Sequence, residues 1–167
     1  QFVAELYELT VNEVNMIDDA INLTYDEFLK GIASPAKFKP NSEDLSLYSN
    51  TLKRALSSSF DTPMQVICLQ GNSPLIIAEI TCLDKKSINS INDNAVADLN
   101  KQLCELDQIL FERKSQGVYV RRNVRIYERD KIYIVKPNQK KYWSFSAAYR
   151  DADDIFAEIM RAWRKSQ

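Results

Sequence analysis

The sequence predicts an α+β fold: one antiparallel sheet of about four strands, arranged as two hairpins and packed against N-terminal, middle and C-terminal helices. Apolar residues recur at helical spacing near the beginning, middle and end of the chain. Between these segments lie two pairs of short runs rich in β-branched residues, which are typical of hairpins. The length of 167 residues and the hydrophobic fraction of 45% fit a single folded domain over residues 1–167.

A capping box and an apolar stripe predict the first helix. Thr10 and Glu13 have the spacing at which each side chain satisfies a backbone N–H of the other residue. A second box, Thr24 with Glu27, indicates that the helix restarts or bends there, and Gly31 with the prolines after it ends the helix. The stripe consists of Val11, Val14, Ile17 and Ile21.

A second helix is expected in "EDLSLYSNTLKRALSSS". Asn41 or Ser42 can cap this helix, and the acidic residues of its first turn suit the helix dipole. Its apolar stripe consists of Leu45, Tyr48, Leu52 and Leu56.

The first hairpin is predicted in "MQVICLQ" and "LIIAEITCL", which are joined by "GNSP". In its second strand, Ile76 and Ile80 share one face, while Ile77 and Glu79 share the other. A sheet with one covered side is the simplest arrangement. The segment "AVADLNKQLCELDQILFERK" then predicts the middle helix, and packing on the sheet is favoured over a helix–helix dimer because its apolar spacing lasts barely two heptads.

The second hairpin is predicted between Val118 and Lys136. A three-residue loop over 128–130 pairs Ile126 with Ile132 and Val124 with Ile134, because side chains alternate with period 2. This register gives the hairpin an apolar inner face and a basic, tyrosine-bearing outer face. A two-residue loop mixes the two faces and is the less favoured alternative.

The C-terminal helix is expected in "SAAYRDADDIFAEIMRAWRKSQ". Its acidic cluster, Asp151, Asp153 and Asp154, is interpreted as the start of the helix, and the basic residues near 161–165 suit its end. The apolar stripe consists of Ala152, Phe156, Ile159, Met160 and Trp163.

The composition excludes many catalytic chemistries. The chain has no histidine and only three glycines, so histidine-dependent nucleophile systems and glycine-rich phosphate loops are excluded. Glu79 is followed two positions later by Thr81, not by the lysine that a nuclease of the PD-(D/E)xK type requires. The acidic clusters at 151–154 and 18–19 are interpreted as a helix start and a solvated helix face; Mg²⁺ ligation at 151–154 is the less favoured alternative. We therefore expect a protein that is not an enzyme and has no cofactor or metal.

Three scattered cysteines, Cys68, Cys82 and Cys104, favour thiols in a reducing cytosol over disulfides. The sequence has no apolar run of the roughly 18 residues that a membrane-spanning helix needs, and it shows no secretory signal. A cytoplasmic protein without membrane association is expected.

Opposite charges in the two parts of the chain direct attention to the second hairpin. Residues 1–112 hold 8 Lys and Arg against 17 Asp and Glu, a net charge of −9, whereas residues 113–167 hold 14 against 6, a net charge of +8. Basic and aromatic residues gather between 119 and 143. The predicted binding residues are Tyr119, Arg121, Arg125, Tyr127, Arg129, Lys131, Tyr133, Lys136, Lys140 and Trp143.

Two functions fit such a surface. Tyr, Trp and Arg are enriched at protein interfaces, so the favoured interpretation is an accessory or interaction protein that binds an acidic protein partner, with a homo-oligomer as a further option. The same cations and rings can neutralise phosphates and stack on bases, so nucleic-acid binding is the main alternative. A metal-dependent enzyme with carboxylate ligands, or a hairpin with no ligand, ranks below both.

The block "VYVRRNVRIYERDKIYIVKPNQKKYWSFSAAYRDADDIFAEIM" resembles the C-terminal tails of small bacterial proteins encoded near DNA-modification or defence genes. It covers about a quarter of the chain and contains no catalytic motif. The resemblance implies a bacterial multi-component system and leaves the biochemical activity open.

Overall fold

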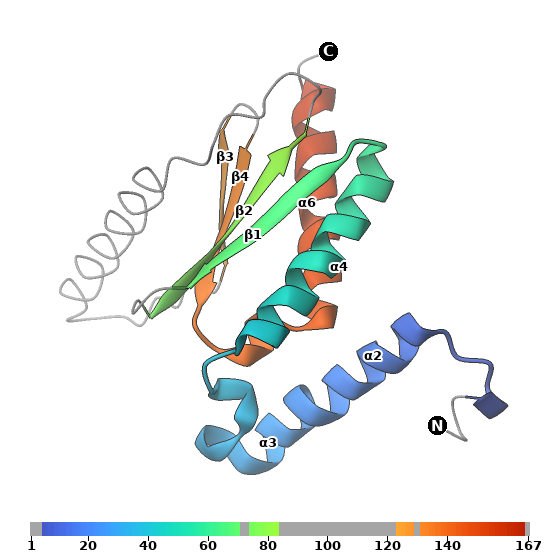
Figure 1. Cartoon of the computed structure of the whole chain (residues 1–167), viewed down its shortest axis with the longest axis vertical. Helices are drawn as coiled ribbons and strands as arrows, with labels where there is room; N and C mark the ends of the chain where they lie inside the picture. Colours follow the sequence, from blue (N-terminus) through green and yellow to red (C-terminus); the bar gives the residue numbers. More distant parts are fainter. Residues whose placement is uncertain (1–4, 71–73, 84–122, 129–130, 166–167) are drawn as a thin grey trace. The chain divides into compact units, whose positions relative to one another are not determined.

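A computed structural model of the protein describes residues 5–70, 74–83, 123–128 and 131–165 (Figure 1). It confirms the predicted α+β class, with one antiparallel sheet of four strands in the order β1-β2-β4-β3. The chain divides into two compact units, a helical unit of residues 1–62 with 138–167 and a sheet unit of residues 63–137. That these units form one domain stays a prediction, and the predicted middle helix lies outside the described residues.

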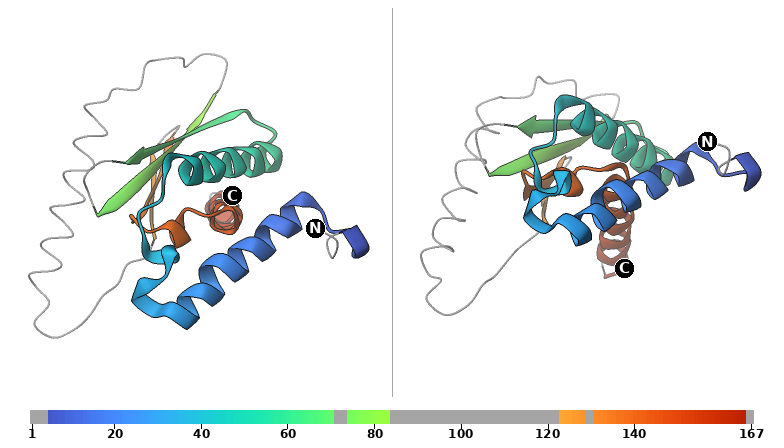
Figure 2. Two further views of the ribbon diagram at one scale, coloured as in Figure 1. Left: turned by 60° about the horizontal axis from the view of Figure 1, so that its bottom comes forward. Right: turned by 90° about the horizontal axis from the view of Figure 1, so that it is seen from below.

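The helical unit begins with α2 (Val11–Asp19), a π-helical segment (Ala20–Tyr25) and α3 (Asp26–Lys30). Figure 2 shows that the three segments continue as one rod, which passes beside α6. The Thr10–Glu13 capping box is confirmed. The second predicted box is wrong: the π-helix carries the backbone past residue 24 without a new helix start, and the residue before α3 makes no side-chain cap.

Helix α4 (Ser42–Phe60) has the predicted cap and the predicted buried stripe. The Asn41 side chain accepts a hydrogen bond from the Asp44 backbone N–H at 2.8 Å, and Asp44 accepts one from the Asn41 N–H at 3.0 Å. The helix ends at Asp61, whose φ of 48° lies in the left-handed region. The confirmed stripe is buried along its length: Leu45, Tyr48, Leu52 and Leu56.

Helix α6 (Phe145–Lys165) starts earlier than the acidic cluster suggests. The Ser144 hydroxyl accepts a hydrogen bond from the Ala147 N–H at 3.3 Å, so a serine lies at the start of the helix, not the aspartates. Asp151 is buried in the second turn, where its carboxylate accepts a hydrogen bond of 2.6 Å from the Tyr48 hydroxyl. The interpretation of 151–154 as the helix start is therefore wrong.

The apolar stripe predicted for α6 is also shifted around the helix. Of the predicted stripe, Ala152 is buried as expected, but Phe156 is 38% exposed and Trp163 is 57% exposed. Ala148 and Ile155, which lie outside that stripe, are buried. Rings still connect the two long helices of this unit: the centroids of Phe60 in α4 and Phe156 in α6 lie 5.5 Å apart. Tyr48 of α4 also contacts Trp143, just before α6, edge-on at 4.9 Å, and Phe145 pairs with Tyr149 within α6.

The sheet unit contains β1 (Met64–Gln70), β2 (Leu75–Cys82), β3 (Val124–Glu128) and β4 (Lys131–Pro137). The first hairpin is confirmed, with Val66 opposite Ile80. Strands β2 and β4 pair in the middle of the sheet. Every residue of β2 from Ile76 to Ile80, and of β4 from Ile132 to Lys136, is buried. The expectation of one covered side is therefore wrong, because the central strands are buried on both faces.

The predicted register of the second hairpin is wrong by one residue. Ile126 lies opposite Tyr133, and Arg125 lies opposite Ile134. This is the pairing of a two-residue loop, the alternative that mixes the two faces. Alternation along β4 could not reveal the register, because both of its faces are buried and neither is marked as the solvent side.

Candidate protein-interaction surface

The observed register separates the residues predicted to form one basic, aromatic face. Tyr133 packs with Ile77 and Val135 on one face of the sheet, whereas Arg125 and Tyr127 point to the other. Three of the predicted binding residues are buried: Tyr133, Lys136 and Trp143. Three more lie outside the described residues: Tyr119, Arg121 and Arg129.

Two of the three remaining predicted cations, Lys131 and Lys140, contact carboxylates of the protein itself, and the third, Arg125, is half-buried. Lys131 Nζ lies 3.0 Å from Glu79 Oε1, and Lys140 Nζ lies 2.8 Å from Asp44 Oδ1. Each such pair reduces the positive charge that the hairpin offers to a ligand. Of the predicted set, Tyr127 is the residue that stands exposed in the described part, at 43%.

Glu79 forms a buried polar cluster in the middle of the sheet. Its side chain is 2% exposed, and Oε1 also accepts a hydrogen bond from the Thr81 hydroxyl at 3.3 Å. Oε2 has no hydrogen-bond partner among the residues that the structure describes. Because Lys131 stands on β4 and Glu79 on β2, the ion pair connects the two central strands. The cluster therefore helps to hold β2 beside β4.

A second surface lies on residues 11–32, here called the arm. Polar contacts hold the arm in the helical unit, together with the buried Leu23 side chain. Asn12 accepts a hydrogen bond of 3.2 Å from Arg54, and the Asp19 carboxylate accepts one of 2.6 Å from the Ser146 N–H in the first turn of α6. A carboxylate at this position is favourable, because the N-terminus of a helix carries partial positive charge. The prediction that both Asp18 and Asp19 are solvated is thus wrong for Asp19.

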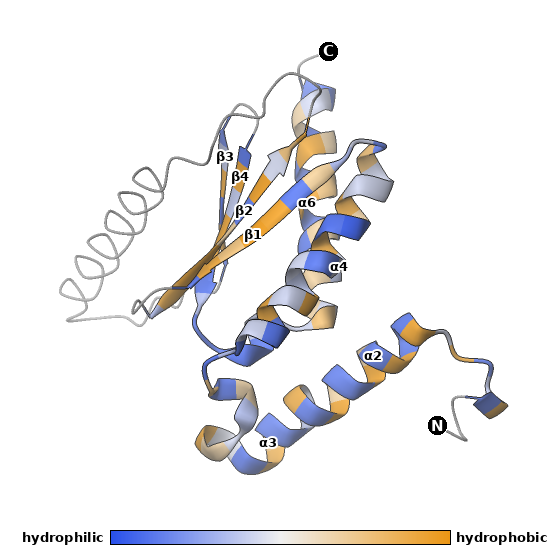
Figure 3. Ribbon diagram, viewed as in Figure 1, coloured by the Kyte–Doolittle hydropathy of each residue, from blue (hydrophilic) through white to orange (hydrophobic). Residues whose placement is uncertain are grey.

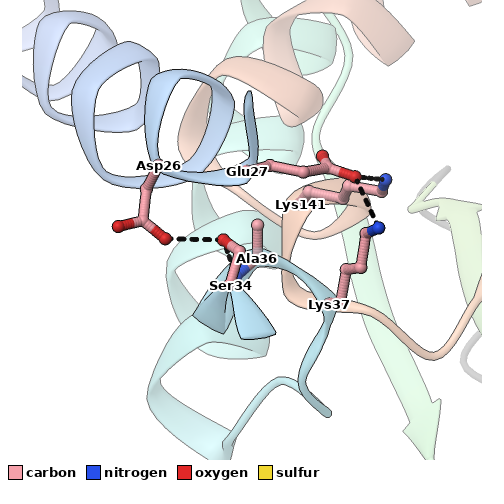
Figure 4. Close-up of polar contacts among 6 residues, drawn as sticks. All are labelled: Asp26, Glu27, Ser34, Ala36, Lys37 and Lys141. Carbon is pink, nitrogen blue, oxygen red and sulfur yellow. Dashed lines mark hydrogen bonds and ion pairs between the residues drawn. The ribbon is translucent and has the colours of Figure 1, made fainter. Parts of the chain in front are cut away.

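Polar contacts also hold the end of the arm (Figure 4). The Ser34 hydroxyl donates to Asp26 at 2.6 Å, and Glu27 Oε1 lies 2.5 Å from Lys141 Nζ and 3.6 Å from Lys37 Nζ. The Lys141 ammonium lowers the pKa of Glu27, and the nearby Lys30 and Ser34 lower the pKa of Asp26. Both carboxylates are therefore held in their charged forms, and both contacts tie the arm to neighbouring segments.

The other side of the arm is apolar and exposed. Ile17 is 44% exposed, Ile21 54%, Phe28 84% and Ile32 86%. Leu23 is the one buried residue across 11–32, all of which the structure describes. Figure 3 shows apolar patches recurring along α2 and α3 between polar residues. We call the following set the outward apolar face: Val11, Met16, Ile17, Ile21, Tyr25, Phe28, Leu29 and Ile32.

The arm thus reverses the usual orientation of a surface helix, whose apolar stripe faces the protein. The predicted stripe consists of Val11, Val14, Ile17 and Ile21, and its periodicity predicts a helix. Val14 is half-buried, whereas the other three are exposed. A second signal lies in the polar residues Asn12 and Asp19, which recur at helical spacing on the other side. Periodicity shows that the two sides differ, but it does not tell which side is covered.

Comparisons with protein-family models, with curated proteins and with solved structures find no match. In the described part of the chain, no helix has both the length and the apolar character needed to cross a membrane.

Proposed function

We propose that the protein is an interaction module that binds a partner protein through the outward apolar face of its arm. The observation that carries this proposal is the exposure of eight large apolar side chains within residues 11–32, from 39% for Met16 to 86% for Ile32. Soluble monomers rarely present contiguous apolar patches, and such patches mark sites of association.

The placement of these residues supports recognition of a helix by its partner. Exposed apolar side chains occur on each helical segment of the arm: Ile17 on α2, Ile21 on the π-helical segment and Phe28 on α3. Helices that lie against apolar grooves or other helices present several such anchors along their length. The polar contacts of Asp19, Asp26 and Glu27 hold the opposite side, so the arm can stay in place while its apolar side meets a partner.

The proposal keeps the expected class of function and changes its location. An accessory protein of a bacterial multi-component system, expected from the sequence, would use the arm and not the basic hairpin. The hairpin loses support because its register separates the predicted residues and because Lys131 and Lys140 are already paired.

The test compares three proteins with affinity tags, expressed in the native host. The arm variant combines Ile17→Ser, Ile21→Ser and Phe28→Ser; the matched control is Leu47→Ser, an exposed apolar residue of α4. A partner is expected to copurify with the wild type and the control, to bind both directly once purified, and to bind the arm variant at least tenfold more weakly. Equal binding by the arm variant, or the absence of any direct partner, would overturn the proposal.

Nucleic-acid binding through residues 113–141 is the second candidate, because this segment holds ten Lys and Arg. The measurement is the affinity for single- and double-stranded DNA and RNA as a function of salt. Each phosphate neutralised should contribute a slope of about −0.7 to −0.9 in a log–log plot. Binding that is lost in Arg125→Glu with Tyr127→Ser, and kept in the arm variant, would favour this candidate over the arm.

A further inference from the structure

The arm and the residues just before it carry a net negative charge. Residues 5–29 contain seven acidic side chains and no Lys or Arg. The first cation after them, Lys30, lies 2.5 Å from Asp26. Glu5, Glu8 and Asp18 are exposed, and no hydrogen bond or ion pair within the described part of the chain engages their carboxylates. The surface around the apolar face is therefore acidic.

This charge disfavours three kinds of occupant. A second copy that docks arm against arm brings its own exposed carboxylates, Glu13 and Asp18, toward those of the first copy, and like charges brought together weaken association. Cellular membranes present anionic headgroups, which attract basic and not acidic helices. Nucleic acids are repelled for the same reason, because their affinity depends on cations that neutralise phosphates.

We infer that the occupant is a basic amphipathic helix of a partner protein, with Lys and Arg flanking its apolar stripe. This inference rests on the proposed function, which makes the arm a docking surface. Apolar residues of the partner would cover Ile17, Ile21 and Phe28, and its cations would face carboxylates such as Asp18. The arm is helical without a break from Val11 to Lys30, so a partner helix of several turns can lie along it.

Opposite charges raise the association rate and the selectivity for the partner, while the apolar contact supplies most of the binding free energy. Exposed ion pairs are individually weak, and three of them together change the affinity about tenfold. Salt weakens such pairs, because the Debye length falls from about 10 Å at 0.1 M to about 3 Å at 1 M. The inferred complex therefore has an apolar contribution that resists salt and an electrostatic contribution that does not.

The test uses three synthetic peptides of 22 residues. All three have the same leucines at helical spacing, and the remaining positions are lysine in the first peptide, glutamine in the second and glutamate in the third. Their affinities for the whole protein are measured by fluorescence anisotropy at low and high salt. The charge variant combines Glu5→Gln, Glu8→Gln and Asp18→Asn. Its matched control combines Glu43→Gln, Glu128→Gln and Asp153→Asn, three exposed carboxylates outside residues 5–32.

The lysine peptide should bind most tightly and the glutamate peptide most weakly. The charge variant should bind the lysine peptide about tenfold more weakly than the control does, and salt should reduce that difference. The arm variant Ile17→Ser, Ile21→Ser, Phe28→Ser should lose binding at all salt concentrations.

Each contrary result overturns a different statement. Equal binding of the lysine and glutamine peptides, lost in the arm variant, overturns the basic partner and leaves the docking surface standing. Binding of the lysine peptide by the arm variant at full strength overturns the apolar docking surface. If no peptide binds while the protein self-associates in ultracentrifugation or binds anionic vesicles, a second copy or a membrane takes the place of the basic partner; if nothing binds at all, both proposals fail.

Discussion

The arm and the central strands both carry apolar residues at regular spacing. These residues are buried in the central strands, whereas most of them are exposed in the arm. In β2 and β4, both faces are buried, and even Glu79 and Lys136 are covered. In the arm, Leu23 is buried and the polar side makes the hydrogen bonds and ion pairs, while eight large apolar side chains face solvent. A regular apolar pattern therefore identifies an element, whereas its polar contacts identify how the element is oriented.

The same contrast appears in the charged residues of the two regions. Glu79 is 2% exposed and relies on Lys131 for a partner of opposite charge. Asp19, Asp26 and Glu27 lie at the edge of the helical unit, where each of them anchors a short stretch of the arm. Charge is thus used inside the sheet to join two strands, and in the arm to join separate segments of the chain.

Truncating one apolar residue in each region should give the largest difference in the free energy of unfolding. Ile77 is fully buried, so Ile77→Ala should lower the free energy of unfolding by about 3 to 4 kcal/mol. Phe28 is larger but 84% exposed, so Phe28→Ala should change it by no more than about 0.5 kcal/mol. Urea denaturation measures both values. A loss above about 1.5 kcal/mol for Phe28→Ala would contradict the exposure of the arm.

Removing the cation from the buried pair should be nearly as costly. Lys131→Met leaves the Glu79 carboxylate buried without its partner and should destabilise the protein by about 3 kcal/mol, toward the lower end for such pairs because the Lys131 side chain is 29% exposed. Adding Glu79→Leu should recover most of the loss, since an apolar pair needs no compensating charge. Lys53→Met on the exposed side of α4 is the control. Failure of the double variant to recover stability would show that the loss in Lys131→Met does not come from the unpaired Glu79 carboxylate.

Local signals made much of the fold predictable. The Thr10 and Asn41 caps, the stripe of α4 and the first hairpin each depend on residues close in sequence, and the structure confirms them. The errors arose where distant contacts decide the outcome. Asp151 lies beside Tyr48, 103 positions away, so its place in the helix could not be read from neighbouring aspartates.

The candidate site was less predictable than the fold. Composition directed attention to the basic hairpin, because cations and tyrosines are conspicuous in the sequence. Whether a side chain is available depends on its partners, and Lys131 and Lys140 find theirs on distant segments. For the arm, the informative contact joins Asp19 to Ser146, 127 positions away. No pattern within residues 11–32 contains that information.

Two adjacent aspartates offer a matched test of how the arm is held. Asp19→Ala removes the carboxylate that accepts from the Ser146 N–H and should destabilise the protein by about 1 kcal/mol, the usual cost of losing a helix cap. Asp18→Ala, one position away on the exposed side, should stay within about 0.5 kcal/mol of the wild type. Thermal unfolding compares the two. Equal effects would show that the arm does not depend on this contact.

The smallest expected effect concerns the pH dependence of the arm's second anchor. The Lys141 ammonium holds the pKa of Glu27 below its usual value of 4.5, so Glu27 contributes stability above about pH 4.5 and loses it as the pH falls through the lowered value. Because the Glu27 side chain is 26% exposed, this contribution is about 0.5 kcal/mol. Glu27→Gln should therefore be slightly less stable than the wild type near neutral pH, and the two should converge in acid.

Lys141→Met provides the complementary measurement. Removing the ammonium lets the pKa of Glu27 rise toward its usual value, so this part of the acid dependence should largely disappear. Denaturant unfolding of the three proteins between pH 3 and pH 7 compares their profiles. A gap between wild type and Glu27→Gln that widens as the pH falls has the wrong sign for a paired carboxylate. Such a result would mean that the protonated form of Glu27 stabilises the arm, and that the Glu27–Lys141 ion pair is not one of its anchors.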